Sequence, residues 1–234
     1  MGFVLSCRNR SRYFFRCFVW RGGGVLRVAV LCEVSGRVRD AFLARGHDAI
    51  SCDLEPTESL GPHIQGDCRH YDWSGYDLII AHPPCTYLSV VANRAMKEDK
   101  TGQRKIERFK AFDFFLWCYY LPVKKVCVEN PIGYVNSHFR KRDQIIQPYF
   151  FGDPEMKTTC LWLRGLPPLI HAKRDELFFS RTHVEKPKPK YQHKHGKKKG
   201  QNVYFVESLS NNSKARSRTF PGIADAMAEQ WGNL

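Results

Sequence analysis

A short apolar stretch that runs into two prolines places the strongest constraint on how this chain folds. Residues 76–80 have the character of a buried strand, and Pro83 and Pro84 follow almost at once. Because proline offers no N–H to a strand ladder and fixes φ, the chain must leave the sheet there. In open α/β sheets, ligands bind at the carboxyl edge, where such strands end. The sequence therefore predicts that Cys85 lies on a stiff loop at a ligand-binding edge.

Cys85 has two interpretations. Most cysteines outside disulfides are small buried apolar residues, whereas a thiolate at a sheet edge is a nucleophile for an electron-poor carbon. A second apolar strand at 126–128, which ends in Glu129, favours the nucleophile. A strand-end thiolate and a strand-end carboxyl group suit attack on a pyrimidine. The sulfur adds to C6 while the carboxyl group hydrogen-bonds to N3 and the exocyclic amine.

The segment at 26–53 predicts a βαβ unit that holds a nucleoside. It contains an apolar strand, a short turn, a helix stopped by Gly46 and a second strand that ends in Asp53. Dinucleotide-binding folds place an acid at this point, on the ribose hydroxyls. Taken alone, an aspartate that caps the turn before Pro56 is the better interpretation of Asp53. The turn at 33–36 has a single glycine, so the expected ligand is a nucleoside without a pyrophosphate.

Two further strand ends carry acids. Glu33 follows the first strand, and Asp67 ends a third predicted strand at 63–67. Asp67 is placed to accept a hydrogen bond from an adenine amine, or it is a loop residue that is solvated locally. Together with Asp53, these acids mark three successive strand ends, which favours one common ligand over three unrelated loops.

The remaining segments predict a sheet covered by helices. Residues 90–101 are polar and are expected to form a mobile loop that closes over a bound base. Residues 103–120 have a helical period and should pack on the sheet. A last helix begins at Pro221, since proline suits the first turn of a helix. The apolar stripe of the helix at 103–120 consists of Ile106, Phe109, Phe112, Phe115 and Leu116.

The domain organisation follows from composition. Residues 1–24 are expected to be a poorly ordered basic extension, and residues 25–234 one domain with a basic loop insert at about 171–202. Nine scattered cysteines without C-x-x-C pairs indicate reduced thiols in a cytosol. No apolar run approaches the roughly 18 residues needed to cross a bilayer. The chain is therefore expected to be cytoplasmic.

Charge predicts the partner. The chain carries a net charge of +14, which favours an anionic partner, with nucleic acid as the first candidate. Lys and His dominate residues 181–200, and this single sign favours an electrostatic clamp on phosphates over a solvated insert. His183, His193 and His195 have no Cys or carboxylate at ligand spacing, so no metal site is predicted.

In chain order, these motifs resemble those of the DNA (cytosine-5)-methyltransferases, particularly the compact forms carried by phages and prophages. The resemblance covers roughly residues 26–231 and rests on Pro83-Pro84-Cys85 followed by Glu129-Asn130. It implies an α/β, Rossmann-like class I methyltransferase fold, with a mostly parallel twisted sheet and helices on both faces. It also implies a monomer that binds double-stranded DNA, in a bacterial host cell if the gene belongs to a phage.

The resemblance implies a role for each site residue. Cys85 would be the nucleophile at cytosine C6 and Glu129 the carboxyl partner at N3, with the target base flipped out of the duplex. The family's Gln-x-Arg-x-Arg strand entry maps onto residues 155–159, where Lys157 retains a charge that helps to hold the base and the cysteine loop. S-adenosylmethionine would lie against Glu33, Ser35, Gly36, Asp53 and Asp67.

Three alternatives remain open. The same cysteine addition would serve an enzyme that attaches another one-carbon group, such as a hydroxymethyl group. The polymer could be tRNA, because the basic loop suits either nucleic acid. A non-catalytic DNA-binding protein of this fold is the third, because Glu33-Val34-Ser35-Gly36 replaces the family's Phe-x-Gly-x-Gly loop. Enzymes that methylate adenine N6 or cytosine N4 are disfavoured, since their loop needs Asp/Asn-Pro-Pro-aromatic.

Overall fold

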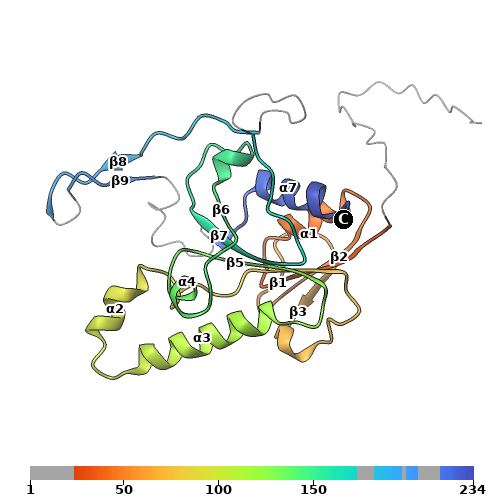
Figure 1. The fold of residues 1–234 in the computed structure, drawn as a ribbon, viewed down its shortest axis with the longest axis horizontal. Coiled ribbons are helices and arrows are strands. Elements are labelled where there is room, and N and C mark those ends of the chain that lie inside the picture. The colour runs from red at the N-terminus through yellow and green to blue at the C-terminus, as the bar shows by residue number, and fades with distance from the viewer. Residues whose placement is uncertain (1–23, 173–181, 197–198, 205–216) are drawn as a thin grey trace, which may run out of the picture.

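The computed structural model describes residues 24–172, 182–196, 199–204 and 217–234. It confirms the predicted α/β fold, with a seven-stranded sheet in the order β3-β2-β1-β4-β5-β7-β6 (Figure 1). Neighbouring strands from β3 to β5 are parallel, and β7 runs antiparallel to both β5 and β6. This topology is that of the Rossmann-like class I methyltransferase fold. The strands are β1 (Arg27–Leu31), β2 (Asp48–Asp53), β3 (His63–Gln65), β4 (Leu78–Ala81), β5 (Lys125–Asn130), β6 (Gln144–Ile146) and β7 (Thr159–Arg164).

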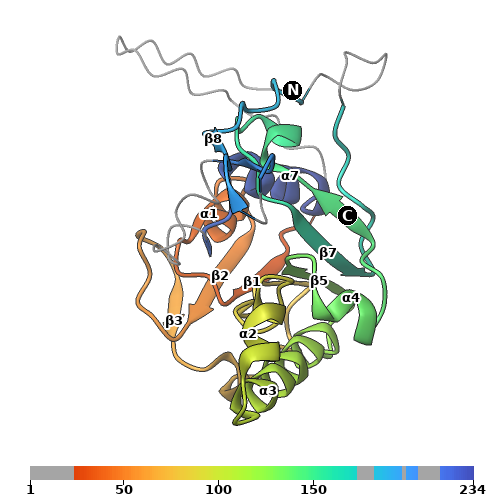
Figure 2. The same ribbon diagram turned by 90° about the vertical axis from the view of Figure 1, so that its left-hand side faces the viewer.

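Helices cover both faces of the sheet, as predicted. Helices α1 (Arg37–Leu43) and α7 (Pro221–Trp231) lie on one face, and α3 (Gln103–Tyr119) lies on the other (Figures 1 and 2). The sheet has an apolar core on each face, one shared with α1 and α7 and the other shared with α3. Because side chains alternate along a strand, β1 contributes Val28 to the core beneath α1 and α7, and Ala29 to the core beneath α3. Apolar side chains are therefore packed on both faces of the sheet.

The expectation of a mobile loop at 90–101 is wrong. This segment contains a helix, α2 (Ala92–Glu98), with Ala92 and Met96 buried one turn apart. Arg94 and Glu98 form an ion pair on its outer face, at the i,i+4 spacing that supports a helix. The polar residues that suggested a loop are the solvent face of a helix with a narrow apolar stripe.

The predicted packing of α3 is correct for its C-terminal half only. Phe115 is fully buried and contacts Trp162 of β7 edge to face. Ile106 is 49% exposed and Phe109 is 61% exposed, so the N-terminal half does not pack on the sheet. The apolar period is continuous along the helix, but the sheet is shorter than the helix.

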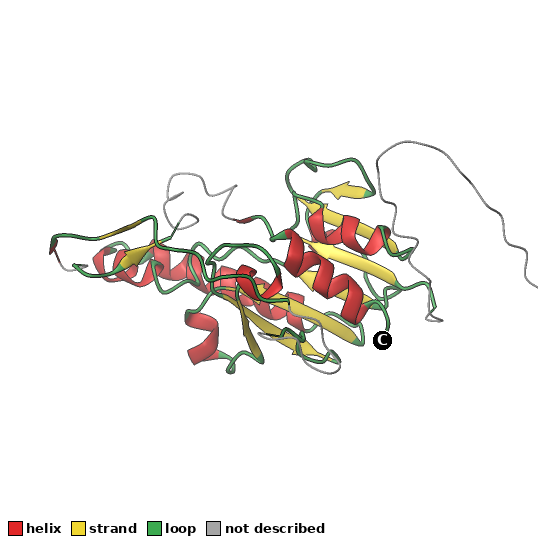
Figure 3. Cartoon of the chain, turned by 90° about the horizontal axis from the view of Figure 1, so that it is seen from above, coloured by secondary structure: helices red, strands yellow, loops and turns green. Residues whose placement is uncertain are grey.

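The basic insert contains a short hairpin rather than an unpaired loop. Strand β8 (Tyr191–Gln192) pairs antiparallel with β9 (Asn202–Val203), and the hairpin extends away from the sheet (Figures 1 and 3). The predictions for residues 1–23 and 173–181 concern segments outside the described residues. The shorter helices are η1 (Cys68–His70), α4 (Tyr134–His138) and η2 (Pro148–Phe151). Among the described helices, none has both the length and the apolar character needed to cross a membrane.

Candidate active site

The Pro-Pro-Cys loop leaves the sheet at its carboxyl edge, as predicted. The backbone N–H of His82 continues the strand ladder beyond β4, donating to Leu31 O at 2.9 Å. The two prolines follow, and Cys85 is exposed at the start of a turn. Its carbonyl oxygen accepts hydrogen bonds from the N–H groups of Leu88 at 3.0 Å and Ser89 at 3.1 Å. The turn therefore presents Cys85 beside the end of β4.

Strand β5 brings Glu129 to the same edge and holds the cysteine loop there. It lies parallel to β4 and ends in Glu129 and Asn130. Asn130 is 2% exposed, and its Nδ2 donates to the carbonyl oxygen of Pro83 at 3.0 Å. The residue after Glu129 is thus bonded to the loop that carries Cys85. The neighbouring strands β4 and β5 therefore carry the cysteine loop and the carboxylate to the same edge of the sheet.

We expect Asn130→Ala to lower the free energy of unfolding by about 1–3 kcal/mol, because the buried Pro83 carbonyl group loses its donor. Chemical denaturation measures this loss. Asn93→Ala is the matched control, since Asn93 lies on the solvent face of α2 and only its side-chain oxygen is engaged, by Arg108. An Asn130→Ala protein as stable as the native protein would show that the buried bond does not hold the loop.

Glu129 lies between two basic groups. Its side chain is 12% exposed, its Oε2 is 3.0 Å from Nδ1 of His82 and its Oε1 is 4.0 Å from Nζ of Lys157. Burial opposes ionisation, but the hydrogen bond from His82 and the charges of His82 and Lys157 outweigh it and lower the pKa of Glu129. The site therefore contains a largely buried carboxylate with one oxygen directed to each basic group.

Lys157, which the sequence predicted as a site residue, is held by Gln147. The side-chain oxygen of Gln147 accepts from the backbone N–H of Lys157 at 3.1 Å, and its Nε2 donates to Oγ1 of Thr158 at 2.6 Å. Nζ of Lys157 also donates to Arg218 O at 3.2 Å. No sequence pattern indicates this role of Gln147, because it depends on contacts with Lys157 and Thr158, about ten residues further along the chain.

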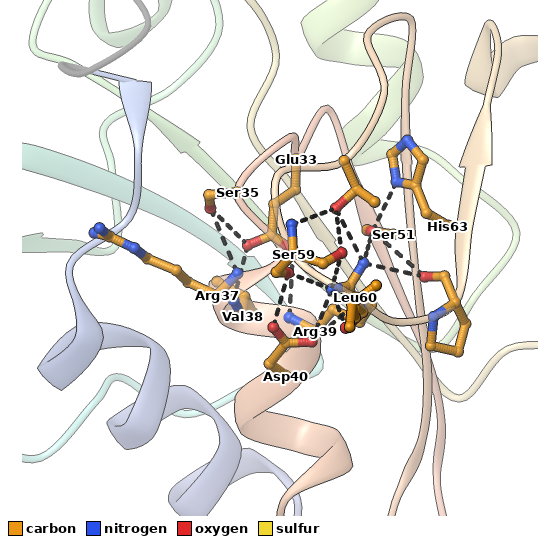
Figure 4. Close-up of polar contacts among 12 residues, drawn as sticks. Glu33, Ser35, Arg37, Val38, Arg39, Asp40, Ser51, Ser59, Leu60 and His63 are labelled. Carbon is orange, nitrogen blue, oxygen red and sulfur yellow. Dashed lines mark hydrogen bonds and ion pairs between the residues drawn. The ribbon is translucent and has the colours of Figure 1, made fainter.

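The turn at residues 33–36, which joins β1 to α1, is held against the start of α1. Glu33 is buried, and its carboxylate accepts from the backbone N–H groups of Val38 at 2.8 Å and Arg39 at 3.3 Å, which caps the helix (Figure 4). Ser35 Oγ donates to Glu33 at 3.4 Å. Cys32, just before the turn, has a φ of 59°, a strained conformation for a residue with a side chain. The predicted cofactor residues Glu33 and Ser35 therefore contact one another within the protein.

The guanidinium group of Arg39 is fully buried next to this turn. Arg39 donates to the side-chain oxygens of Ser51 at 3.0 Å and Ser59 at 2.6 Å, and it pairs with Asp40 at 2.8 Å (Figure 4). Gly36 has a φ of 68°, and a Cβ there would collide with Ser59 Oγ and the Arg39 guanidinium. Gly36 is thus required by the packing of the protein itself. Arg39 holds the segment after β2 against the start of α1.

The other two predicted cofactor acids differ in how their oxygens are used. Asp53 Oδ1 accepts from the N–H of Glu55 at 3.0 Å, as its turn-capping interpretation predicted, while Oδ2 accepts no hydrogen bond from any described residue. Asp67 is bonded through both oxygens to Arg69, whose side-chain and backbone hydrogen bonds lower the pKa of Asp67 to about 2. Leu54, next to Asp53, is 69% exposed. Of these two acids, only Asp53 therefore keeps a carboxylate oxygen without a hydrogen bond from a described residue.

The Asp67–Arg69 pair predicts a pH dependence. Because the pKa of Asp67 is lowered in the folded state, the pair stabilises the protein above the ordinary carboxyl pKa and is lost as pH falls from about 4 to about 2. We expect Asp67→Asn to lower the free energy of unfolding by about 1 kcal/mol or less at neutral pH, since the Arg69 side chain is 58% exposed and solvent screens the pair. Denaturation at several pH values tests this. Arg69→Met should abolish the same pH dependence. If the free energies of unfolding of Asp67→Asn and the native protein differ as much at pH 2 as at neutral pH, the Asp67–Arg69 pair is not the cause.

The buried histidine of the insert binds another histidine. His183 is buried, and its Nε2 lies 2.8 Å from Nδ1 of His171. Phe150 stacks on both rings, with centroid distances of 4.5 and 4.7 Å. In the ranges that the structure describes, no group of three or more His, Cys, Asp or Glu side chains is arranged to hold a metal ion. The pair contributes to the packing of the insert on η2.

Comparison with known proteins gives distant structural likenesses. No protein-family model matches the chain, and no curated protein sequence does. An RNA methyltransferase from Salinibacter ruber, in complex with S-adenosyl-L-homocysteine, is 14% identical with a TM-score of 0.32, covering 63% of this chain and 86% of that one. The Entamoeba histolytica methyltransferase EhMeth is 12% identical with a TM-score of 0.39, covering 70% of this chain and 58% of that one. These likenesses are too distant to assign a function to the chain, so function is inferred from the site.

Proposed function

We propose that the chain is an S-adenosylmethionine-dependent methyltransferase that acts on C5 of cytosine in DNA through a covalent bond from Cys85 to C6. One observation supports this above the others. Two adjacent parallel strands carry the Cys85 loop and Glu129 to one edge of the sheet, and the Asn130–Pro83 hydrogen bond joins them. A thiol and a carboxyl group at one edge are the two groups that addition to a pyrimidine requires.

The proposed reaction begins and ends with a thiolate. The sulfur of Cys85 forms a bond to C6, and the electron pair of the C5=C6 bond moves to C5. Glu129 takes up a proton when the base binds and donates a hydrogen bond to N3. S-adenosylmethionine, when bound, would supply the methyl group to C5, and S-adenosylhomocysteine would leave with the electron pair of the broken sulfur–methyl bond. C5 then loses its proton to water, the C5=C6 bond forms again, and the bond from the Cys85 sulfur to C6 breaks. The thiolate is regenerated, and the base carries a methyl group in place of a proton.

The residues at the ends of β1 and β2 fit the nucleoside half of this cofactor. Oδ2 of Asp53 is available to a ribose hydroxyl group, and the exposed side chain of Leu54 offers an apolar surface to a flat base. Glu33 and Asp67 are engaged with α1 and Arg69, so their role here is to shape the turns beside the proposed cofactor site.

Two groups of cations flank the carboxyl edge and support a nucleic-acid substrate. The β8–β9 hairpin and helix α2 lie at the same end of the molecule, on different sides of the sheet (Figures 1 and 3). Lysines and arginines on both are exposed, so a polyanion at this edge would meet positive charge from two directions. The base must leave the duplex to reach Cys85. The exposed cations are Lys186, Lys188, Lys190, Lys194 and Lys199 near the hairpin, and Arg94, Lys97, Lys100 and Arg104 on and after α2.

Trapping on a modified base tests this function. With a duplex that contains 5-fluorocytosine and with S-adenosylmethionine, we expect the native protein to form an adduct that survives denaturation, because fluorine at C5 cannot leave as a proton does. Cys85→Ser should form none, whereas Cys68→Ser, a matched change at a buried thiol, should still react. The proposal fails if the native protein forms no adduct or if Cys85→Ser still does. Mass spectrometry of the modified nucleoside distinguishes methyl from another one-carbon group.

A second function, non-catalytic nucleic-acid binding, is favoured by one observation. The carboxylates of Glu33 and Asp67 are both engaged by groups of the protein itself, which leaves the cofactor fewer contacts than the sequence predicted. Calorimetric titration with S-adenosylmethionine separates the two functions. Measurable binding contradicts the non-catalytic protein, and its absence contradicts the methyltransferase.

A further inference from the structure

His82 is a buried polar residue that the proposed reaction leaves without a role. It lies between the end of β4 and Pro83, and its side chain is 11% exposed. Nδ1 is 3.0 Å from Oε2 of Glu129, whereas Nε2 is buried and has no hydrogen-bond partner among the described residues. A buried imidazole with one engaged nitrogen is costly unless that contact, or a ligand, compensates.

The position of His82 in the sheet places it between two acids. Strands β1, β4 and β5 are neighbours, and Glu33, His82 and Glu129 follow or end them in that order. The charged groups that act on the imidazole are Glu129 from β5, Glu33 from the turn after β1, and Lys157 from the segment before β7. Burial lowers the pKa of His82, but the hydrogen bond and charge of Glu129, with the charge of Glu33, outweigh it and raise the pKa.

The hydrogen bond fixes one oxygen of the catalytic carboxyl group. With Oε2 held by Nδ1 of His82, the other oxygen, Oε1, is the one that faces Nζ of Lys157 at 4.0 Å. A carboxyl group that rotates freely would present either oxygen to a ring in varying directions. A carboxyl group bonded on one side presents a single oxygen to it.

We propose that His82 is a positioning residue, which holds the Glu129 carboxyl group in the orientation that binds the pyrimidine ring. This inference rests on the proposed function, since it assigns a part in the same reaction. His82 does not touch the reacting carbon atoms. It acts through Glu129, and the prolines that follow it fix its place beside the cysteine loop.

Two variants separate the hydrogen bond from the size of the ring. In His82→Asn, the side-chain amide N–H takes about the place of Nδ1–H, whereas His82→Phe keeps a ring without a donor. We expect His82→Phe to slow formation of the 5-fluorocytosine adduct on the order of 10²-fold, the cost of a misoriented catalytic group. His82→Asn should recover most of this rate. The affinity for the duplex should not change in either variant, because the effect is on reaction and not on binding.

A second measurement does not depend on activity. The imidazole of His82, followed by NMR during a pH titration, should show a pKa above the ordinary histidine value in the native protein and a lower one in Glu129→Gln. A His82→Phe protein that reacts as fast as the native protein overturns the inference, as does a His82→Asn protein as slow as His82→Phe, or a titration that Glu129→Gln does not change. A native protein that forms no adduct overturns the proposed function. The titration of His82 in the native protein and in Glu129→Gln then still tests whether His82 and Glu129 interact.

Discussion

Glu129→Gln should slow the formation of the Cys85 adduct by about 10²–10⁴-fold, the usual contribution of a positioned acid or base. The amide has the shape of the carboxyl group but carries no charge and cannot exchange a proton with N3. Glu129 lies between His82 and Lys157, so both basic groups lose their acidic partner at once. The measurement is the rate of adduct formation with protein in excess over duplex, followed by intact mass.

The control for this variant is Glu107→Gln. Glu107 lies on α3, where it forms an ion pair with Lys110 away from the site. It should react like the native protein. Duplex affinity, measured separately, should be nearly unchanged in both variants. If Glu129→Gln reacts at the native rate, Glu129 is not the partner of Cys85, and the proposed chemistry is wrong.

Arg39→Met should lower the free energy of unfolding by about 3–5 kcal/mol, the cost of breaking a buried charged network by removing one partner. The guanidinium is fully buried, and methionine would leave Ser51 and Ser59 without this donor and Asp40 without its ion pair. Because Arg39 also holds residues 57–62 against α1, the turn that carries Ser35 and Gly36 should loosen as well. Denaturant unfolding gives the size of the loss.

Arg94→Met is the matched control for Arg39→Met. Arg94 makes its ion pair with Glu98 on the exposed face of α2, where the side chain is 88% exposed. Its replacement should leave the denaturation midpoint nearly unchanged. An Arg39→Met protein with the stability of the control would show that apolar packing, and not the guanidinium, secures the segment after β2.

The parts of the fold that local sequence determines were predicted closely. Strand β2 ends at Asp53 and helix α7 begins at Pro221, as predicted, because an apolar run ends at a stop signal in the first case and proline marks a helix start in the second. The proximity of the Cys85 loop, Glu129 and Lys157 was also predicted. For the Cys85 loop and Glu129, it follows from a general property of parallel sheets, whose strands deliver their carboxyl ends to one edge. Lys157 precedes the antiparallel strand β7, and its place was expected from the family resemblance alone.

The features that the sequence did not predict depend on contacts between residues that are far apart in the chain. The His82–Glu129 contact joins residues 47 positions apart, and no local pattern marks it. Arg39 occupies an ordinary helix position, and its burial is decided by the segment that folds over it from beyond β2. For the same reason, the sequence shows Glu33 and Asp67 only as acids at strand ends. Whether such an acid faces a ligand or a neighbouring N–H depends on the surrounding chain.

The bond between Asn130 and Pro83 has a consequence for motion at the site. Glu129 and Asn130 are consecutive on β5, so their side chains leave opposite faces of the strand, one towards His82 and one towards the proline loop. A displacement of β5 along its own axis would therefore move the carboxylate and, through Asn130, pull on the carbonyl group of Pro83. The cysteine loop could stay behind only if this hydrogen bond broke.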